Sequence, residues 1–146
     1  MGVDGLSDDT IRAILSGTRR IAMVGASAKP WRDSNHVLQF LLDRGFDVTP
    51  VNPNLTDQSI HGRTVVASVR DAEPLEMVDI FRASRNVGPV VDAAIAGGAR
   101  VIWMQLGVID HDAAARAHAA GLTVVMDRCP IIEDRRLGPF RHARDH

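Results

Sequence analysis

The sequence has little cysteine, little lysine and no tyrosine: Cys129 and Lys29 are the only residues of their kinds among 146. A single cysteine excludes an intrachain disulfide and a cysteine-based zinc site, which fits a reducing cytoplasm. No apolar run approaches the roughly 18 residues of a membrane span, and the first residues lack the basic and apolar regions of a signal peptide. We therefore expect a cytoplasmic protein that does not enter a membrane.

An excess of charge of one sign is also missing. The formal net charge is −1 at pH 7, which argues against a general nucleic-acid-binding surface but allows a local basic pocket. The six histidines form no cluster with the spacing of metal ligands, so we expect no metal site.

The composition itself, 45% hydrophobic and 24% charged residues, is that of a folded globular protein. A chain of this length buries a core without help from disulfides or metals. We therefore expect residues 1–146 to form a single domain, with a flexible tail from roughly residue 138 to 146.

Short apolar runs rich in Val, Ile and Met alternate with helical patterns along the chain. Most of these runs show no alternation of polar and apolar residues, which is typical of strands buried on both faces of a parallel sheet. Strands are expected at residues 21–25, 47–51, 64–67, 77–81, 100–106 and 122–127, and helices at 7–17, 35–44, 87–96 and 112–120. This order predicts an α/β fold with a doubly wound, mainly parallel sheet and helices on both faces.

Ligands of such a sheet bind beyond the carboxyl ends of the strands, where the strand order reverses. The turn after the first strand runs from Gly25 to Ser34 and contains Ser27, Lys29 and Arg32. Gly25 allows a tight turn, and the amides at the start of the next helix favour a phosphate, beside which a hydroxyl and two cations are expected. The turn lacks the other glycines of a dinucleotide fingerprint, so a plain strand–helix turn with solvated charges is the alternative.

Two other strand ends face the same edge. The second strand ends in Val51, Asn52 and Pro53, where NAD-binding proteins carry an acidic residue for the ribose. The missing carboxylate argues against an NAD site, and a rigid turn is the alternative interpretation of these residues. The fourth strand ends in Phe81 and Arg82, which either face the crevice or serve as a core residue and a surface ion pair.

Three further residues are open to more than one interpretation. Cys129, after the last strand, is either a partly buried, inert thiol or a reactive one favoured by the neighbouring Arg128. Trp103 lies within an apolar strand and is expected in the core. Trp31 lies in the loop after the first strand, where it either covers a ligand or packs on the sheet edge.

Five blocks follow one another along the chain: residues 21–30 with Arg32 and Ser34, then 45–53, 78–82, 101–107 and 124–129. Each block is unspecific alone, but together, at this spacing, they resemble the family of small stand-alone CoA-binding proteins. That family is similar to the CoA-binding domain of the succinyl-CoA synthetase alpha subunit. The likeness extends from about residue 15 to residue 137.

The resemblance implies a Rossmann-like domain that holds coenzyme A at the carboxyl edge of its sheet. It suggests that the phosphates of CoA lie at the turn of Gly25, Ala26 and Ser27, with Lys29, Arg32 and Ser34 in the same block. It places the adenosine of CoA beside Val51, Asn52 and Pro53. Phe81, Arg82 and Ser84 would border the other side of the binding crevice. A carboxylate beside the ribose would repel the 3′-phosphate of CoA, so its absence suits this ligand. The long form of the family carries a phosphorylated histidine in a second domain, which we do not expect here, and we infer no ligase activity.

We interpret the chain as a module that binds CoA or an acyl-CoA without chemistry of its own, as a carrier, a sensor or a subunit. Its assembly, as a homodimer or within a larger complex, stays open. One alternative is an NAD(P)-dependent oxidoreductase, and another is a redox-responsive protein in which Cys129 forms a mixed disulfide with CoA. If three strand spacings separate Cys129 from the first strand, the distance is about 14 Å, which a long pantetheine arm would have to span.

Overall fold

The computed structural model describes residues 2–143 and contains one five-stranded parallel sheet. Its strands are β1 (Arg20–Val24), β2 (Asp47–Val51), β5 (Met77–Ile80), β6 (Val101–Met104) and β7 (Thr123–Val125). They are arranged in the order β2-β1-β5-β6-β7, so the direction of winding reverses between β1 and β5. The predicted α/β class and doubly wound, Rossmann-like arrangement are confirmed.

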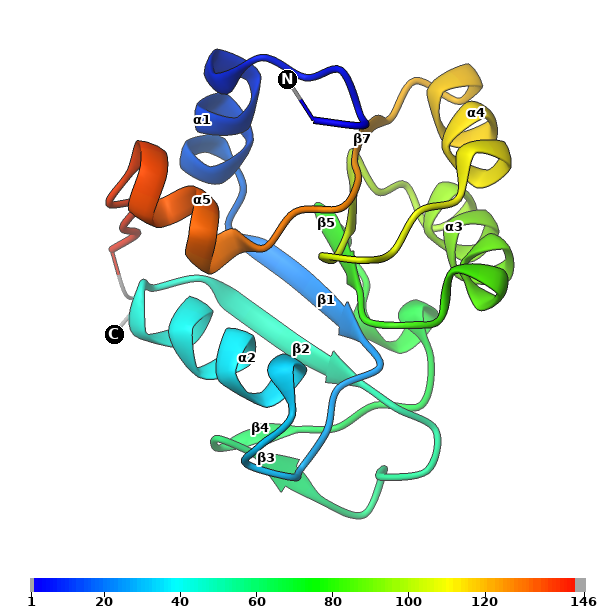
Figure 1. The fold of residues 1–146 in the computed structure, drawn as a ribbon. Helices are drawn as coiled ribbons and strands as arrows, with labels where there is room; N and C mark the ends of the chain where they lie inside the picture. Colours follow the sequence, from blue (N-terminus) through cyan, green and yellow to red (C-terminus); the bar gives the residue numbers. More distant parts are fainter. Residues whose placement is uncertain (1, 144–146) are drawn as a thin grey trace.

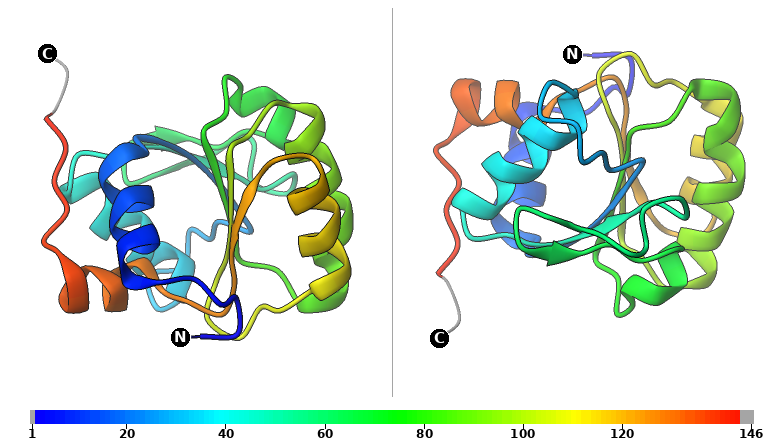
Figure 2. Two further views of the ribbon diagram at one scale, coloured as in Figure 1. Left: turned by 90° about the horizontal axis from the view of Figure 1, so that it is seen from above. Right: turned by 90° about the horizontal axis from the view of Figure 1, so that it is seen from below.

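Helices cover both faces of this sheet (Figures 1 and 2). One face carries α1 (Asp8–Gly17), α2 (Asp33–Asp43) and α5 (Pro130–Leu137), and the other carries α3 (Val87–Ala96) and α4 (His111–Ala119). Two short 3-10 helices, η1 (Val69–Ala72) and η2 (Ser84–Asn86), lie on either side of β5 in the sequence. Within residues 2–143, none of these helices is both long and apolar enough to span a bilayer.

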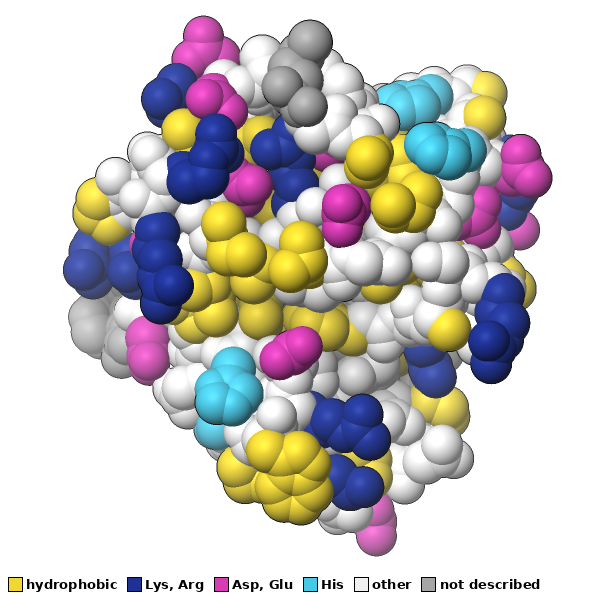
Figure 3. All heavy atoms as spheres, in the orientation of Figure 1, with side chains coloured by type: hydrophobic (Ala, Val, Ile, Leu, Met, Phe, Trp, Pro, Cys, Tyr) yellow, Lys and Arg dark blue, Asp and Glu magenta, His cyan; other side chains and the backbone are white. Residues whose placement is uncertain are grey.

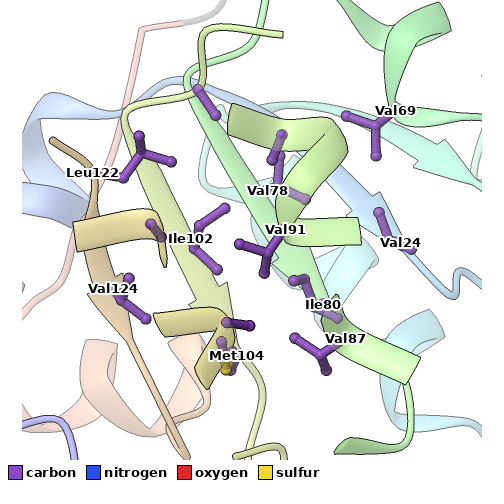
Figure 4. Packing of buried hydrophobic residues seen from close by; sticks show 14 of the residues in the cluster. Val24, Val69, Val78, Ile80, Val87, Val91, Ile102, Met104, Leu122 and Val124 are labelled. Atoms are coloured by element: carbon purple, nitrogen blue, oxygen red, sulfur yellow. The ribbon is translucent and has the colours of Figure 1, made fainter. Parts of the chain in front are cut away.

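Each face of the sheet has its own hydrophobic core because successive side chains of a strand point to opposite faces. Val78 and Ile80 of β5 pack with Val87 and Val91 of α3 on one face (Figure 4). On the other face, Met77 and the fully buried Trp103 pack among residues of α1, α2 and α5. Trp103 is thus a core residue, as predicted, and Asp79 of β5 must point into the same face.

The N-terminal segment, which we define as residues 2–6, is tied to the far end of the chain. The Asp4 carboxylate accepts hydrogen bonds from Arg128 Nε at 2.8 Å and from the backbone N–H of Met126 at 3.0 Å. Arg128 also lies 3.4 Å from a Glu133 carboxylate oxygen, and its carbonyl accepts from the Trp103 indole N–H at 2.8 Å. These bonds hold the first residues, the end of β7 and the start of α5 together.

Two helices begin with a side-chain cap, and a third does not. The side chain of Ser7 caps α1 and that of Asp110 caps α4. The residue before α2 is Arg32, and it makes no side-chain cap hydrogen bond. The start of α2 is therefore a helix N-terminus without a side-chain partner.

Two predictions of secondary structure were wrong. Residues 64–67 do not form a strand of the main sheet: they contribute to a separate antiparallel hairpin, β3 (Ser59–Ile60) with β4 (Arg63–Thr64), and Val66 makes one isolated bridge to Val51. The helix α5 was not among the predicted helices, because the chain after Asp127 is polar and rich in arginine. Pro130 starts this helix, a position that proline favours.

Part of the expected flexible tail lies outside the described residues, which end at 143. Within the described part, Phe140 is buried, and the His142 N–H donates to the carbonyl of Arg44 at 2.8 Å. The His142 ring also makes a 3.0 Å hydrogen bond with the carbonyl of Leu15 and an edge contact with Phe46.

Candidate functional site

An open cleft of about 530 Å³ lies at the carboxyl edge of the sheet. It is built on the ends of four neighbouring strands and on the start of α2, and it spans the point where the strand order reverses between β1 and β5. Its lining residues are Gly25, Ala26, Ser27, Lys29, Arg32, Asp33, Ser34, Asn52, Leu55, Phe81, Arg82, Gln105, Leu106 and Val108. The position agrees with the general rule for ligands of doubly wound sheets.

Gly25 is required by the geometry of the first turn. Its φ is +87°, a conformation that side chains with a Cβ rarely adopt. A Cβ at this position would lie 2.1 Å from the carbonyl oxygen of Phe81, far inside van der Waals contact. The Gly25 N–H donates to the carbonyl of Val51 at 3.1 Å. The turn therefore brings the backbones that follow β1, β2 and β5 close together.

Two asparagine side chains hold this turn in place. Asn52 Nδ2 donates to the carbonyl of Ala26, and Asn35 Nδ2 donates to the carbonyl of Ser27, both at 2.9 Å. Because the N–H and C=O of a trans peptide point in opposite directions, the N–H groups of Ser27 and Ala28 are directed away from these asparagines. The turn thus presents these two backbone N–H donors on the side opposite the two asparagine side chains.

The lining carries three cations, Lys29, Arg32 and Arg82, and one carboxylate, Asp33. The first amides of a helix lack partners within the helix and carry its positive dipole end, so the uncapped start of α2 adds to this positive potential. Figure 3 shows Lys and Arg side chains gathered beside a large exposed hydrophobic side chain at the lower end of the face it presents. Trp31 is 71% exposed, with Lys29 Nζ 6.0 Å from its ring centroid.

The β6 side of the cleft is more apolar than the turn. Phe81, Leu106 and Val108 line it together with Gln105, the first residue after β6. The Gln105 N–H donates to the carbonyl of Ile80 at 3.2 Å, so the parallel pairing of β5 with β6 continues one residue beyond β6. This pairing places Phe81 and Gln105 on neighbouring strand ends.

Two buried polar side chains near this side make no hydrogen bond in the described part of the chain. Asp79 is fully buried, and neither of its carboxyl oxygens has a partner. Burial raises the pKa of Asp79 well above the usual value. Gln105 is 6% exposed, and its Oε1 is buried and likewise without a partner. Native proteins pair nearly all such groups, so each of these two calls for an explanation.

Nine of the twelve residues predicted for the ligand site line the cleft, and three do not. The nine are Gly25, Ala26, Ser27, Lys29, Arg32, Ser34, Asn52, Phe81 and Arg82. Val51 is buried and contributes only its carbonyl, which bonds the turn. Pro53 is exposed outside the lining. The Ser84 hydroxyl accepts from the N–H of Ile109 at 3.0 Å, so it fixes the loop between β6 and α4.

Five lining residues were not in the predicted set: Asp33, Leu55, Gln105, Leu106 and Val108. Gln105 directly follows β6, at an edge where ligands of such sheets bind, but nothing in the sequence distinguished it as a ligand contact. Asn35, which supports the turn without lining the cleft, was read only as a helix residue.

Cys129 is half-buried immediately before α5 and is absent from the cleft lining. The strand order places β7 three positions from β1, as expected. Among residues 2–143 there is no group of three or more His, Cys, Asp or Glu side chains arranged to hold a metal ion.

Comparison with known proteins finds a matching family model and several similar proteins. Residues 19–135 match the family model described as a CoA binding domain. The uncharacterized protein YneT of Bacillus subtilis strain 168 is 34% identical over 120 residues, which cover 82% of this chain and 87% of YneT. A solved structure of a hypothetical protein from Pyrococcus horikoshii OT3 is 41% identical, with a TM-score of 0.89 over 94% of this chain and 96% of that one. The structure of cell-free ID.343 from Thermus thermophilus is 32% identical, with a TM-score of 0.85 over 90% of this chain and 99% of that one.

Proposed function

Because this chain belongs to the CoA binding domain family, we propose that it binds coenzyme A or an acyl-CoA in the cleft at the carboxyl edge of its sheet. CoA carries a pyrophosphate and a 3′-phosphate, so its nucleotide half is strongly anionic. A site for it needs backbone donors and cations in one place, without a carboxylate beside the ribose.

The observation that carries this proposal is the grouping of Lys29, Arg32 and Arg82 around the glycine turn and the start of α2. Backbone donors, a helix start and three cations together form an anion site. On the β2 side of the turn the lining is Asn52 and Leu55, which offers an adenine an amide group and an apolar surface.

We further propose that the protein acts as a carrier, a sensor or a subunit of a larger assembly and leaves its ligand chemically unchanged. Apart from the carboxylate of Asp33, the lining groups are amides, hydroxyls, cations and apolar side chains, which suit holding a ligand. Cys129 lies outside this lining, so the mixed-disulfide hypothesis gains no support from the cleft.

Thermal unfolding in the presence of candidate ligands tests the proposal. A ligand that binds only the folded protein, at 100 times its Kd, adds about 2.7 kcal/mol to the free energy of unfolding. We expect CoA and acetyl-CoA to raise the Tm, dephospho-CoA to raise it less, and NAD and NADP to leave it unchanged. Stabilisation by the nicotinamide nucleotides without stabilisation by CoA would instead support the oxidoreductase alternative.

A pair of arginine variants separates a phosphate site from a general charge effect. Arg32→Ala removes a cation from the cleft, and we expect it to weaken CoA binding about tenfold, in the range of one charge-assisted hydrogen bond. Arg12→Ala removes the same charge from α1. Arg12 pairs with Asp9 at 2.7 Å and does not line the cleft. Equal weakening by both variants would contradict a phosphate contact at Arg32.

A further inference from the structure

Gln105 is a buried polar side chain in the wall of the cleft with an unused acceptor. It is 6% exposed, it lines the cleft, and its Oε1 has no hydrogen-bond partner. A carboxamide can accept and donate at once. A buried acceptor without a partner is unfavourable unless something else, such as a ligand, satisfies it.

The strand order fixes which part of a ligand reaches Gln105. The ends of β2 and β6 lie on opposite sides of the β1–β5 pair. Asn52 and Leu55 follow β2, the phosphate turn follows β1, and Gln105 follows β6. A ligand whose phosphates lie at the turn must therefore direct one of its ends toward Asn52 and the other toward Gln105.

The chemistry of CoA matches these two directions. Its pyrophosphate separates the adenosine from a long arm that contains two amide groups, a hydroxyl and a pair of methyl groups. Phe81, Leu106 and Val108 give the β6 side an apolar lining, and Leu106 is 57% exposed there. The methyl and methylene groups of the arm suit this lining, and an amide N–H suits the free acceptor of Gln105.

We infer that Gln105 is the residue that makes the cleft select a nucleotide with a pantetheine arm over the bare nucleotide. It accepts a hydrogen bond from an amide N–H of the arm, while Leu106 covers the apolar part of the arm. The inference rests on the proposed function, since it uses the same cleft and the same ligand class.

A purely structural role for Gln105 makes a different prediction. Asp79 lies on the neighbouring strand β5, in register with Trp103, which is two residues before Gln105. Its carboxyl group also has no hydrogen-bond partner, and it does not line the cleft. If Gln105 served only to pair with Asp79, replacing it would lower the stability of the free protein and would affect every ligand alike. A variant that weakens the binding of CoA but not that of a nucleotide without the arm therefore separates the two roles.

The test compares the binding of CoA with that of adenosine 3′,5′-bisphosphate by isothermal titration calorimetry. The bisphosphate lacks the arm and one phosphate of the pyrophosphate, so each ligand is compared between variant and wild type. Gln105→Met keeps the length of the side chain and removes its hydrogen-bonding groups. We expect this variant to bind CoA about tenfold more weakly, the range for a lost buried hydrogen bond, and to bind the bisphosphate within about twofold of the wild type. The matched control is Gln39→Met on α2, where Gln39 is exposed and bonds Asp43 at 2.8 Å; both ligands should bind it normally.

The outcomes are separable. Equal weakening of both ligands by Gln105→Met, or unchanged CoA binding, overturns the inference and leaves the proposed function standing. A wild-type protein that binds neither ligand overturns the proposed function and this inference with it. If Gln105→Met does not fold, the variant Leu106→Ser replaces it in the test, because an exposed position tolerates serine. Weaker binding of CoA with unchanged binding of the bisphosphate supports the inference. Unchanged binding of CoA opposes it.

Discussion

Asp79 stands in β5, the central strand of the sheet, with Met23 and Trp103 as its neighbours in register. Neither carboxyl oxygen is hydrogen-bonded, and burial raises its pKa well above the usual value. The folded protein therefore holds a proton on Asp79 over a pH range in which the unfolded chain has already released it. As the pH rises from about 4, this difference lowers the free energy of unfolding until the folded pKa is reached.

Asp79→Asn is predicted to remove this pH dependence. Asparagine is nearly isosteric with the protonated aspartic acid and does not titrate. The free energy of unfolding of the variant, relative to the wild type, should therefore rise with pH above about 4, with a slope of at most about 1.4 kcal/mol per pH unit. Urea unfolding at a series of pH values measures this slope. Parallel stability curves for the two proteins would show that Asp79 ionises normally in the folded state.

Single residues also show where sequence reasoning succeeds at the site and where it fails. That the turn after β1 lines the cleft was predictable, because Gly25, Ser27, Lys29 and Arg32 lie close together in the sequence and their chemistry is local. Gln105 was not, because the sequence shows a glutamine after a strand but not that its oxygen lacks a partner. Whether that oxygen has a partner depends on how side chains of β5 and β6 pack, and these two strands come side by side only in the folded protein.

At the level of elements, the N-terminal segment depends on one ion pair. Burial of Asp4 alone would raise its pKa, but hydrogen bonds from Arg128 and from the backbone of Leu6 and Met126 outweigh this, so the pKa lies below the usual 3.8. The Asp4 side chain is 1% exposed and that of Arg128 is 9% exposed. Removing one member of such a pair leaves the other charge buried with less compensation.

Asp4→Asn is predicted to lower the free energy of unfolding by about 3 kcal/mol at neutral pH, the lower range for breaking a buried pair. Because the folded pKa of Asp4 is lowered, its contribution is fully present above the unfolded value and is lost as the pH falls through the folded value. The two proteins should therefore converge in stability at strongly acidic pH. Asp9→Asn provides the control: Asp9 is 92% exposed in its pair with Arg12, and no measurable loss is expected. An equal loss in the two variants would argue against the buried pair.

Elements with complete local signals were predicted from the sequence, and those that depend on distant partners were not. Most of the strands, such as β6, are apolar runs whose burial on both faces could be read directly. In β2 the residues Asp47 and Thr49 are only half-buried. Val66 belongs to a similar apolar run, residues 64–67, but it pairs with the main sheet only through a single bridge to Val51. The helix α5 is polar along much of its length because its buried Glu133 and Asp134 pair with arginines elsewhere in the chain, including Arg44 and Arg128.

For the whole molecule, both hydrophobic cores share one sheet, so neither helical layer can be removed without exposing a face of it. The expectation of a single domain leads to a measurable result. In a Trp31→Phe variant, Trp103 is the only tryptophan and is fully buried in β6. We predict that unfolding followed by its fluorescence and by far-ultraviolet circular dichroism gives one transition with the same midpoint. Two separate midpoints would show that the layers unfold independently.

The bond between Asp4 and Arg128 has a consequence for synthesis. These residues are 124 positions apart in the chain, so during translation Asp4 emerges long before its partner exists. A nascent chain that already contains β1, β2, β5 and β6 still lacks the cation that neutralises this carboxylate. The N-terminal segment can therefore reach its final place only after the stretch that follows β7 has left the ribosome.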